Sequence, residues 1–180
     1  MRSLAIEHSR AAYAADFVVY GLAVAVLALW LGVGTPESQR AVACALVALG
    51  LLGWTLLEYL AHRFVLHHLP PFSVWHAEHH ERPTALICTP TLVSAALIVL
   101  LVFLPALALG RLWRAAALTL GVTSGYLVYS CVHHALHHWH GGGRWLHARK
   151  HAHALHHRPG SAGHYGVTTA FWDFVFGTLR

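Results

Sequence analysis

The sequence has few charged residues and very few acids. Only 11% of its 180 residues are Asp, Glu, Lys or Arg, and seven of these are acidic. Apolar side chains make up 57% of the chain, and the mean hydropathy is +0.53. This composition excludes an ordinary water-soluble domain and is typical of membrane proteins. No run of Lys or Arg suggests binding to nucleic acid, and the formal charge of +5 fits a membrane protein that faces anionic lipid.

Cysteine is also scarce. Cys44, Cys88 and Cys131 are odd in number, widely spaced and surrounded by apolar sequence, and no CxxC pair occurs. This excludes a disulfide framework and a thiolate zinc site. We expect the three thiols to be small buried core residues.

Four apolar segments are each close to the ~20 residues that a membrane-spanning helix requires. The first is expected to be a retained span rather than a signal peptide, because no small-residue cleavage site closes it. Pro105 is expected to kink the third segment or end its regular part. The segments are 17–33, 41–60, 86–109 and 115–132.

The links between these segments are unequal. Residues 34–40 and 110–114 are short, turn-like connections, whereas 61–85 and 133–180 are longer and contain nearly all the histidine. We therefore expect one all-α integral membrane domain over residues 1–180. It would have four transmembrane helices in two hairpins and a helical, histidine-rich cap formed by the two longer segments.

The distribution of Lys and Arg predicts the orientation in the membrane. Both termini and both histidine-rich segments are expected to be cytoplasmic, because cationic residues concentrate on that side. Arg-over-Lys and Ala-rich usage, with no retrieval signal at residues 178–180, favours a bacterial inner membrane over the endoplasmic reticulum. Nine cations lie on the histidine side (Arg2, Arg10, Arg63, Arg82, Arg144, Arg149, Lys150, Arg158, Arg180) and three on the other (Arg40, Arg111, Arg114).

Histidine is the residue type present in excess, with 18 copies. All but His8 fall within residues 62–80 and 133–164. Histidine is a frequent metal ligand. A histidine-rich loop that binds metal loosely would have polar residues between its histidines, whereas apolar residues lie between them here. Ten of them form four spaced clusters: His62 and His67; His76, His79 and His80; His133 and His137; and His153, His156 and His157.

The spacings predict a metal centre. Residues i, i+3 and i+4 share one face of a helix, so each H-x2-H-H triplet is expected to point its three imidazoles in one direction. His62 and His67 differ, because five residues turn an α-helix by about 140°. This pair either serves two metals or sits where the helix unwinds. Ten imidazoles are too many for one ion, and we expect two.

Other histidines have open roles as ligands, supporting donors or surface residues. His134 and His138 lie one step around the helix from His133 and His137, so the two pairs cannot both face one centre. The sequence likewise allows any of these three roles for His68, His140, His147, His151 and His164.

Carboxylate ligands are few. Soluble di-iron bundles use Glu and Glu-x-x-His ligands, but no E-x-x-H occurs here. The centre is therefore expected to be nearly all imidazole. Glu58, and more weakly Asp173 and Glu78, are candidates to accept a hydrogen bond from an imidazole N–H. Glu58 is equally well interpreted as an interfacial carboxylate.

The motifs resemble those of the fatty acid hydroxylase family, also called the sterol desaturase superfamily, over residues 58–178. EYLAHRFVLHH, WHAEHH, YSCVHHALHH and HALHH stand where that family has its histidine boxes. The tail GVTTAFWDFVFGT is similar to the fatty acid 2-hydroxylase branch. The resemblance implies a four-span helical fold with a cytosolic cap over a dimetal centre. It also implies O2-dependent hydroxylation of an acyl chain, often in a ceramide-type lipid, and it assigns the same ten histidines as ligands.

The chemistry implies cofactors and partners. Hydroxylation of an unactivated C–H bond needs a metal that activates O2, and we expect two iron ions, with O2 as co-substrate and zinc possible in the isolated protein. The cytochrome b5 domain that some family members carry is absent from this sequence. We therefore expect a separate electron donor, which would be cytochrome b5-like, a ferredoxin or a reductase. The oligomeric state is left open.

Two other classes of function remain as alternatives. A lipid desaturase or a sterol or carotenoid oxidase would use the same metal site. A protein that transports or stores a transition metal would not be an enzyme, but transporters usually place their ligands near the bilayer midplane. Here the clusters lie beyond the ends of the apolar segments.

Overall fold

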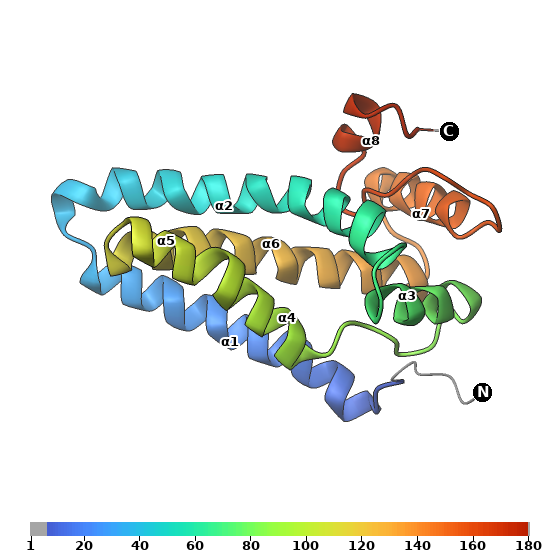
Figure 1. Ribbon diagram of the computed structural model, residues 1–180, viewed down its shortest axis with the longest axis horizontal. Coiled ribbons are helices and arrows are strands. Elements are labelled where there is room, and N and C mark those ends of the chain that lie inside the picture. The colour runs from blue at the N-terminus through green and yellow to red at the C-terminus, as the bar shows by residue number, and fades with distance from the viewer. Residues whose placement is uncertain (1–6, 180) are drawn as a thin grey trace. The chain divides into compact units, whose positions relative to one another are not determined.

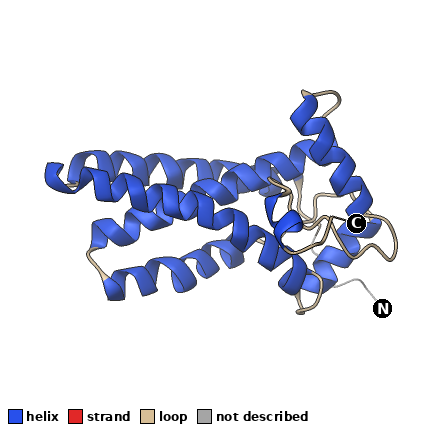
Figure 2. Ribbon diagram, turned by 90° about the horizontal axis from the view of Figure 1, so that it is seen from above, coloured by secondary structure: helices blue, strands red, loops and turns tan. Residues whose placement is uncertain are grey.

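A computed structural model describes residues 7–179 of the chain. Arg2 and Arg180, which entered the orientation count, lie outside the described residues. Within that range the regular structure is helical (Figure 2), and the only strand-like feature is an isolated antiparallel bridge between Glu7 and Ile87. The predicted all-α fold is confirmed.

The elements follow one another along the chain with short connections (Figure 1). Two π-helical stretches and one 3-10 turn, labelled η, interrupt or join the α-helices. In order they are α1 (Arg10–Gly34), η1 (Glu37–Gln39), α2 (Arg40–Leu60), η2 (Ala61–Leu66), α3 (Phe72–Glu81), α4 (Thr91–Ile98), η3 (Val99–Phe103), α5 (Leu104–Leu109), α6 (Leu112–His138), α7 (Arg144–His156) and α8 (Phe171–Val175).

Four of the described helices are long and apolar enough to cross a membrane, as predicted, and the chain is an integral membrane protein. The third begins at Thr91 and not at Leu86, because Pro90 favours extended backbone directly before it. The fourth continues past the apolar segment to His138 and so carries the third histidine cluster. The four spans are Arg10–Gly34, Glu37–Leu66, Thr91–Leu109 and Leu112–His138.

Pro105 interrupts the regular α-helix of the third span without ending it. Its ring crowds the carbonyl group four residues earlier, and it lacks an N–H. A π-helical stretch, η3, occupies the turn before it, and the helix then continues as α5 to Leu109. Proline and a π-helical turn are both recognised causes of an interruption within a helix.

The chain forms two compact units. One, here called the bundle unit, comprises residues 14–54 and 89–127. The other, here called the histidine unit, comprises residues 55–88, 128–179 and the described part of the N-terminal segment, 7–13.

Small residues bring the helices of the bundle unit close together. Gly50 of α2 and Gly121 of α6 face each other so closely that a Cβ atom on Gly50 would lie 2.4 Å from the Leu118 carbonyl oxygen. Small residues are the usual means by which membrane helices approach at short range. The buried core of this unit is built from Leu31, Ala43, Trp113, Ala116, Ala117 and Leu120.

This contact predicts a stability effect that depends on position. Gly50→Val should lower the free energy of unfolding by at least about 2 kcal/mol, because the atoms that the new side chain meets belong to backbone and cannot rotate away. Gly53→Ala in the same helix is the matched control, since a Cβ there meets nothing within 4 Å. Thermal unfolding in detergent measures both. Equal melting temperatures for the two variants would contradict the close contact.

Polar side chains also join α1 to α4 within the bundle unit. The Tyr20 hydroxyl lies 2.7 Å from the Ser94 hydroxyl, and Thr91 donates to the Asp16 carboxylate at 2.8 Å. Buried polar groups in a membrane helix are costly unless they are paired. These pairs therefore fix how α1 and α4 pack.

The cysteines are not the buried core residues that were expected. Cys44 and Cys131 are exposed and Cys88 is partly buried, and none of the three forms a disulfide. A small apolar side chain on the outer face of a membrane helix is solvated by lipid. Core burial is therefore not required for such a residue.

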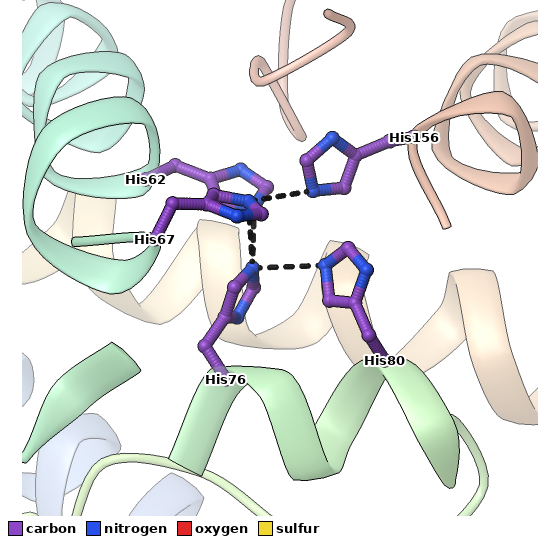
Figure 3. A group of neighbouring side chains, drawn as sticks. All are labelled: His62, His67, His76, His80 and His156. Atoms are coloured by element: carbon purple, nitrogen blue, oxygen red, sulfur yellow. Dashed lines mark hydrogen bonds between the residues drawn. The ribbon is translucent and has the colours of Figure 1, made fainter. Parts of the chain in front are cut away.

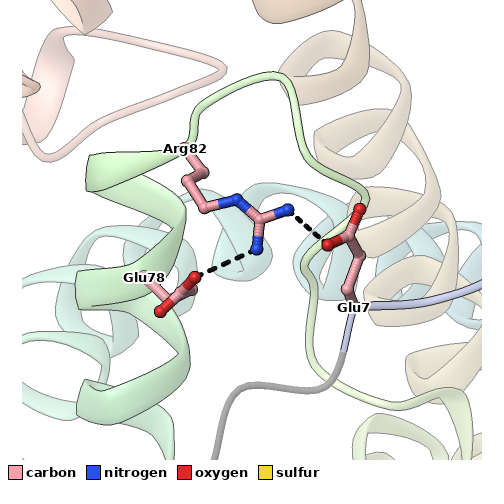
Figure 4. A network of polar contacts seen from close by, with 3 residues as sticks. All are labelled: Glu7, Glu78 and Arg82. Atoms are coloured by element: carbon pink, nitrogen blue, oxygen red, sulfur yellow. Dashed lines mark hydrogen bonds and ion pairs between the residues drawn. The ribbon is translucent and has the colours of Figure 1, made fainter. Parts of the chain in front are cut away.

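The histidine unit contains α3, α7, α8, η2 and the C-terminal turns of α6. Arg82, directly after α3, holds the N-terminal segment to this unit (Figure 4). Its guanidinium donates to the Glu7 carboxylate and, at 3.1 Å, to Glu78. These ion pairs are exposed and contribute little to stability, but they fix the segment next to α3.

Candidate metal centre

Five histidine side chains converge in the histidine unit (Figure 3). They come from η2 and the residue after it, from α3 and from α7, and one ring nitrogen of each lies within 4.8 Å of the others. The Nε2 atom of His76 lies 3.0 Å from that of His62, 3.1 Å from that of His67 and 3.0 Å from that of His80. The Nε2 atoms of His67 and His156 are 3.2 Å apart. We call His62, His67, His76, His80 and His156 the first group.

The π-helical stretch explains how His62 and His67 enter one group. Their spacing of five residues places them on different faces of an α-helix, but η2 spans Ala61–Leu66 and repeats its hydrogen bonds every five residues. The two rings therefore lie roughly parallel, 5.3 Å apart and inclined by 24°. The structure therefore supports the second interpretation of this pair, that it lies where the helix geometry changes.

Four more histidines form a second group, His79, His133, His137 and His153, again with one ring nitrogen of each within 4.8 Å of the others. The Nε2 atoms of His153 and His137 are 2.8 Å apart. His157 lies at the edge of this group, with its Nε2 atom 3.1 Å from that of His153 and its ring stacked 4.2 Å from His80. All ten expected histidines thus lie in one unit, each in ring contact with at least one other.

Each H-x2-H-H triplet contributes to both groups and does not point in a single direction. From α3, His76 and His80 enter the first group and His79 the second. From α7, His156 enters the first and His153 the second. Around a helix, side chains i and i+4 point in nearly the same direction, whereas side chain i+3 points to the other side of residue i. One triplet can therefore reach two adjacent sites. Helices α3 and α7 therefore each contribute histidines to both groups.

Backbone carbonyl groups fix the tautomers of two histidines. The Nδ1 atom of His62 lies 2.5 Å from the Tyr165 carbonyl oxygen, and that of His156 lies 2.8 Å from the Gly163 carbonyl oxygen. A carbonyl can only accept, so each Nδ1 carries the proton and each Nε2 turns a lone pair toward the group. The histidine spacing could not identify Tyr165 and Gly163, because a residue of any type has a backbone carbonyl group that can accept a hydrogen bond.

The two candidate carboxylates hold the loop that supplies these carbonyl groups. Glu58 accepts from the Val167 and Thr168 N–H groups at 2.7 and 2.8 Å and from the Thr168 hydroxyl at 2.6 Å. Asp173 accepts from the N–H groups of Tyr165 and Gly166 at 2.9 and 2.8 Å. Both acids are buried. They support the imidazoles through the backbone of residues 165–168.

Burial keeps the imidazoles neutral at physiological pH. It is the main reason that the pKa of His67 falls to about 4, that of His80 to about 3 and that of His79 to about 2, and neighbouring imidazoles lower each further. Burial likewise lowers the pKa of His157 to about 4. A neutral imidazole is the form that binds a metal ion. The pKa values of His76, His153 and His156 are also lowered.

The residues present fit a pair of metal ions. Two ligands bound to one ion at about 2.1 Å lie about 3.0–3.4 Å apart, and the measured Nε2 separations of 2.8–3.2 Å are close to this range. Among the described residues, neither ring nitrogen of buried His79 has a hydrogen-bond partner. A cation bound between His79 and the neighbouring imidazoles would explain a buried ring nitrogen that has no hydrogen-bond partner.

The remaining histidines lie outside both groups. His134 stacks on His138 at 4.5 Å, and its Nδ1 atom lies 3.2 Å from the Tyr13 hydroxyl. This agrees with the expectation that this pair cannot face the same centre as His133 and His137. His68, His140, His147, His151 and His164 are likewise in neither group.

Comparison with known proteins identifies the family. The sequence profile described as fatty acid hydroxylase matches residues 47–178, which include both histidine groups and the loop that supports them. The chain belongs to the fatty acid hydroxylase family. The resemblance inferred from the histidine boxes and the C-terminal tail is confirmed.

Curated relatives place the chain in the 2-hydroxylase branch of the family. It is 37% identical to a dihydroceramide fatty acyl 2-hydroxylase of Arabidopsis thaliana over 74% of the chain and 60% of the relative. It is 34% identical to the fatty acid 2-hydroxylase of Rattus norvegicus over 80% of the chain and 41% of the relative. The chain thus spans roughly two to three fifths of the length of these relatives.

A solved hydroxylase shares the fold of this family member. Full-length Scs7p, of which only the hydroxylase domain is visible, superposes with a TM-score of 0.73 at 27% identity. The match covers 91% of this chain and 66% of that one. The four-span helical fold is therefore that of a known fatty acid hydroxylase structure.

The lowered pKa values predict that this family member loses stability in acid. Imidazoles in the unfolded chain take up protons near pH 6.5, whereas those of His67 and His157 do so near 4 in the fold. Between these values the unfolded state binds more protons, so stability is complete above pH 6.5 and falls as the pH drops toward 4. Melting temperatures of metal-free protein from pH 8 to 4.5 measure this. A melting temperature that stayed constant below pH 6.5 would contradict the prediction.

Proposed function

We propose that the chain hydroxylates the acyl chain of a membrane lipid, at C2 of a fatty acid or ceramide-type lipid, using O2 and two metal ions. The observation that carries the proposal is the convergence of ten imidazoles in two adjacent groups. The names of the relatives supply the substrate class, because they are fatty acid and dihydroceramide 2-hydroxylases.

The first group would hold one ion and the second group, completed by His157, the other. The His157 Nε2 atom is within reach of that site, 3.1 Å from the Nε2 atom of His153. We propose iron for both, because imidazole suits iron and the reaction needs a redox metal. Bound iron would supply the activation of O2, whereas zinc would fill the same ligands without redox chemistry.

The reaction requires two electrons from outside the chain. One oxygen atom of O2 replaces a C–H bond by C–OH, and the other leaves as water with two electrons and two protons supplied. A separate donor on the cytoplasmic side, either a cytochrome b5-like protein, a ferredoxin or a reductase, would deliver the electrons. We propose that both termini and the two histidine-rich segments, 61–85 and 133–180, are on the cytoplasmic side of a bacterial inner membrane, because nine of twelve cations lie on that side.

The residues of the chain itself would orient the ligands and exclude water. The carbonyl groups of Tyr165 and Gly163 keep the Nε2 lone pairs of His62 and His156 directed inward. Exclusion of water is supported by the burial of His62, His79, His153 and His156, each at most 5% exposed. A dry site protects a reactive oxidant from side reactions.

The proposal is tested by lipid mass spectrometry on cells that express the wild-type chain or a His156→Ala, His157→Ala double variant. Metal content of both purified proteins is measured in parallel. We expect a lipid that gains one oxygen only with the wild type, and about two metal ions per chain. A lipid that instead loses two hydrogens would indicate a desaturase. Bound metal with no altered lipid, despite a supplied donor, would indicate metal transport or storage.

A further inference from the structure

Helix α8 presents its apolar side chains outward and its carboxylate inward. Phe171 and Phe174 are 57% and 73% exposed, whereas Asp173 between them is 1% exposed. A short helix on a water-facing surface shows the opposite arrangement, with the carboxylate in solvent and the phenyl rings covered. The surroundings of α8 are therefore expected to be apolar.

The exposed apolar surface extends beyond α8 itself. Val175, Phe176 and Leu179 are each close to half exposed. Single exposed apolar residues are common, but five of them within nine residues are typical of a surface that interacts with an apolar partner.

Polar contacts attach α8 to the side of a membrane-spanning helix. The Trp172 Nε1 atom donates to the Thr55 hydroxyl at 2.9 Å, and the Thr178 hydroxyl lies 3.1 Å from that of Tyr59. Thr55 lies five residues before Leu60, the last residue of α2. That is about 8 Å of helix rise, so α8 lies beside the last turns of α2 and not past its end (Figure 1).

The neighbouring turns of the same helix also carry exposed apolar residues. Leu57 and Phe64 are 44% and 50% exposed. Between them, Arg63 donates to the Tyr59 hydroxyl at 2.8 Å and places its guanidinium 5.0 Å from the Phe64 ring. An Arg side chain that covers aromatic rings is typical of the level at which acyl chains meet headgroups.

We propose that α8, with Phe176 after it, is immersed in the bilayer and that its partner is the acyl chains of membrane lipid. It would be a monotopic element that extends the lipid-facing surface of α2. The inference is independent of any metal or reaction. Its consequence is that lipid lies two contacts from the first histidine group, because Asp173 binds the Tyr165 N–H and the Tyr165 carbonyl binds His62.

Spin-label accessibility in phospholipid nanodiscs tests the proposal. Phe174→Cys is labelled in a variant of the chain whose three native cysteines are replaced by Ala, and Phe171→Cys provides a second position. Leu29→Cys, at an exposed position of α1, is the lipid control, and Glu37→Cys, in the short turn η1, is the water control. Power-saturation measurements use O2, which concentrates in lipid, and a water-soluble nickel chelate.

We expect labels at residues 174 and 171 to match the label at residue 29, accessible to O2 and shielded from nickel. Labels that match residue 37 would overturn the proposal in favour of a water-facing helix. Labels shielded from both reagents would overturn it in favour of a protein contact, such as a second copy of the chain. Metal-free protein should give the same result as loaded protein.

Discussion

Replacing His156 by Ala is expected to remove about one metal ion per chain and to lower acyl-chain hydroxylation at least 100-fold. His156 is 1% exposed and its Nε2 atom lies 3.2 Å from that of His67 within the first group, so its loss removes one imidazole of that site. Loss of a residue that merely supports a ligand costs about 10–100-fold in metal affinity or activity, and loss of a ligand costs more. Metal analysis and lipid product formation on the purified variant measure the two effects.

His153→Ala and His151→Ala on the same helix complete the experiment. His153 belongs to the second group, so its loss should remove the other ion with a similar loss of product. His151 is exposed on α7 and belongs to neither group, so its variant should retain both ions and full activity. If His156→Ala kept two ions and wild-type turnover, the assignment of the first group as a metal site would be wrong.

Removing the carboxylate of Asp173 is expected to destabilise the protein almost as strongly as a large core deletion. In Asp173→Ala the N–H groups of Tyr165 and Gly166 and the Thr178 hydroxyl each lose an acceptor. A buried donor without a partner costs about 1–3 kcal/mol. The free energy of unfolding should therefore fall by at least about 3 kcal/mol, a large part of a total near 5–15 kcal/mol.

The effect should extend to the metal site, because the same loop orients His62. Thermal unfolding in nanodiscs and metal content are measured for Asp173→Ala, Asp173→Asn and the control Glu81→Ala. Asp173→Asn keeps one acceptor oxygen and should be intermediate, and Glu81 is exposed and should be neutral. Wild-type melting temperature and metal content in Asp173→Ala would show that the loop does not depend on this carboxylate.

The spans and the ligand types could be predicted because both depend on local sequence. Apolar runs of about 20 residues identify membrane helices, and clustered histidines identify metal-binding chemistry regardless of how the chain packs. The third span illustrates the limit. Its start at Thr91 depends on Pro90, and its path past Pro105 depends on a π turn that apolar periodicity does not reveal.

The division of the histidines between two groups could not be predicted from spacing. An α-helical register places His62 and His67 apart, whereas η2 brings them together. The same register aims His76, His79 and His80 in one direction, whereas the structure shares them between two sites. The carbonyl groups of Tyr165 and Gly163 could not be predicted as histidine partners for a different reason, since every residue has a backbone carbonyl group.

Oxygen-isotope labelling tests whether the chain inserts an atom of O2 into a lipid acyl chain. Purified iron-loaded protein in nanodiscs, supplied with a ceramide-type lipid and an electron donor, reacts under ¹⁸O2 in ordinary water. We expect a hydroxylated acyl chain that contains one ¹⁸O atom, and no such product from the His156→Ala variant. A product whose oxygen comes from water, or an unchanged lipid beside fully loaded protein, would contradict this expectation.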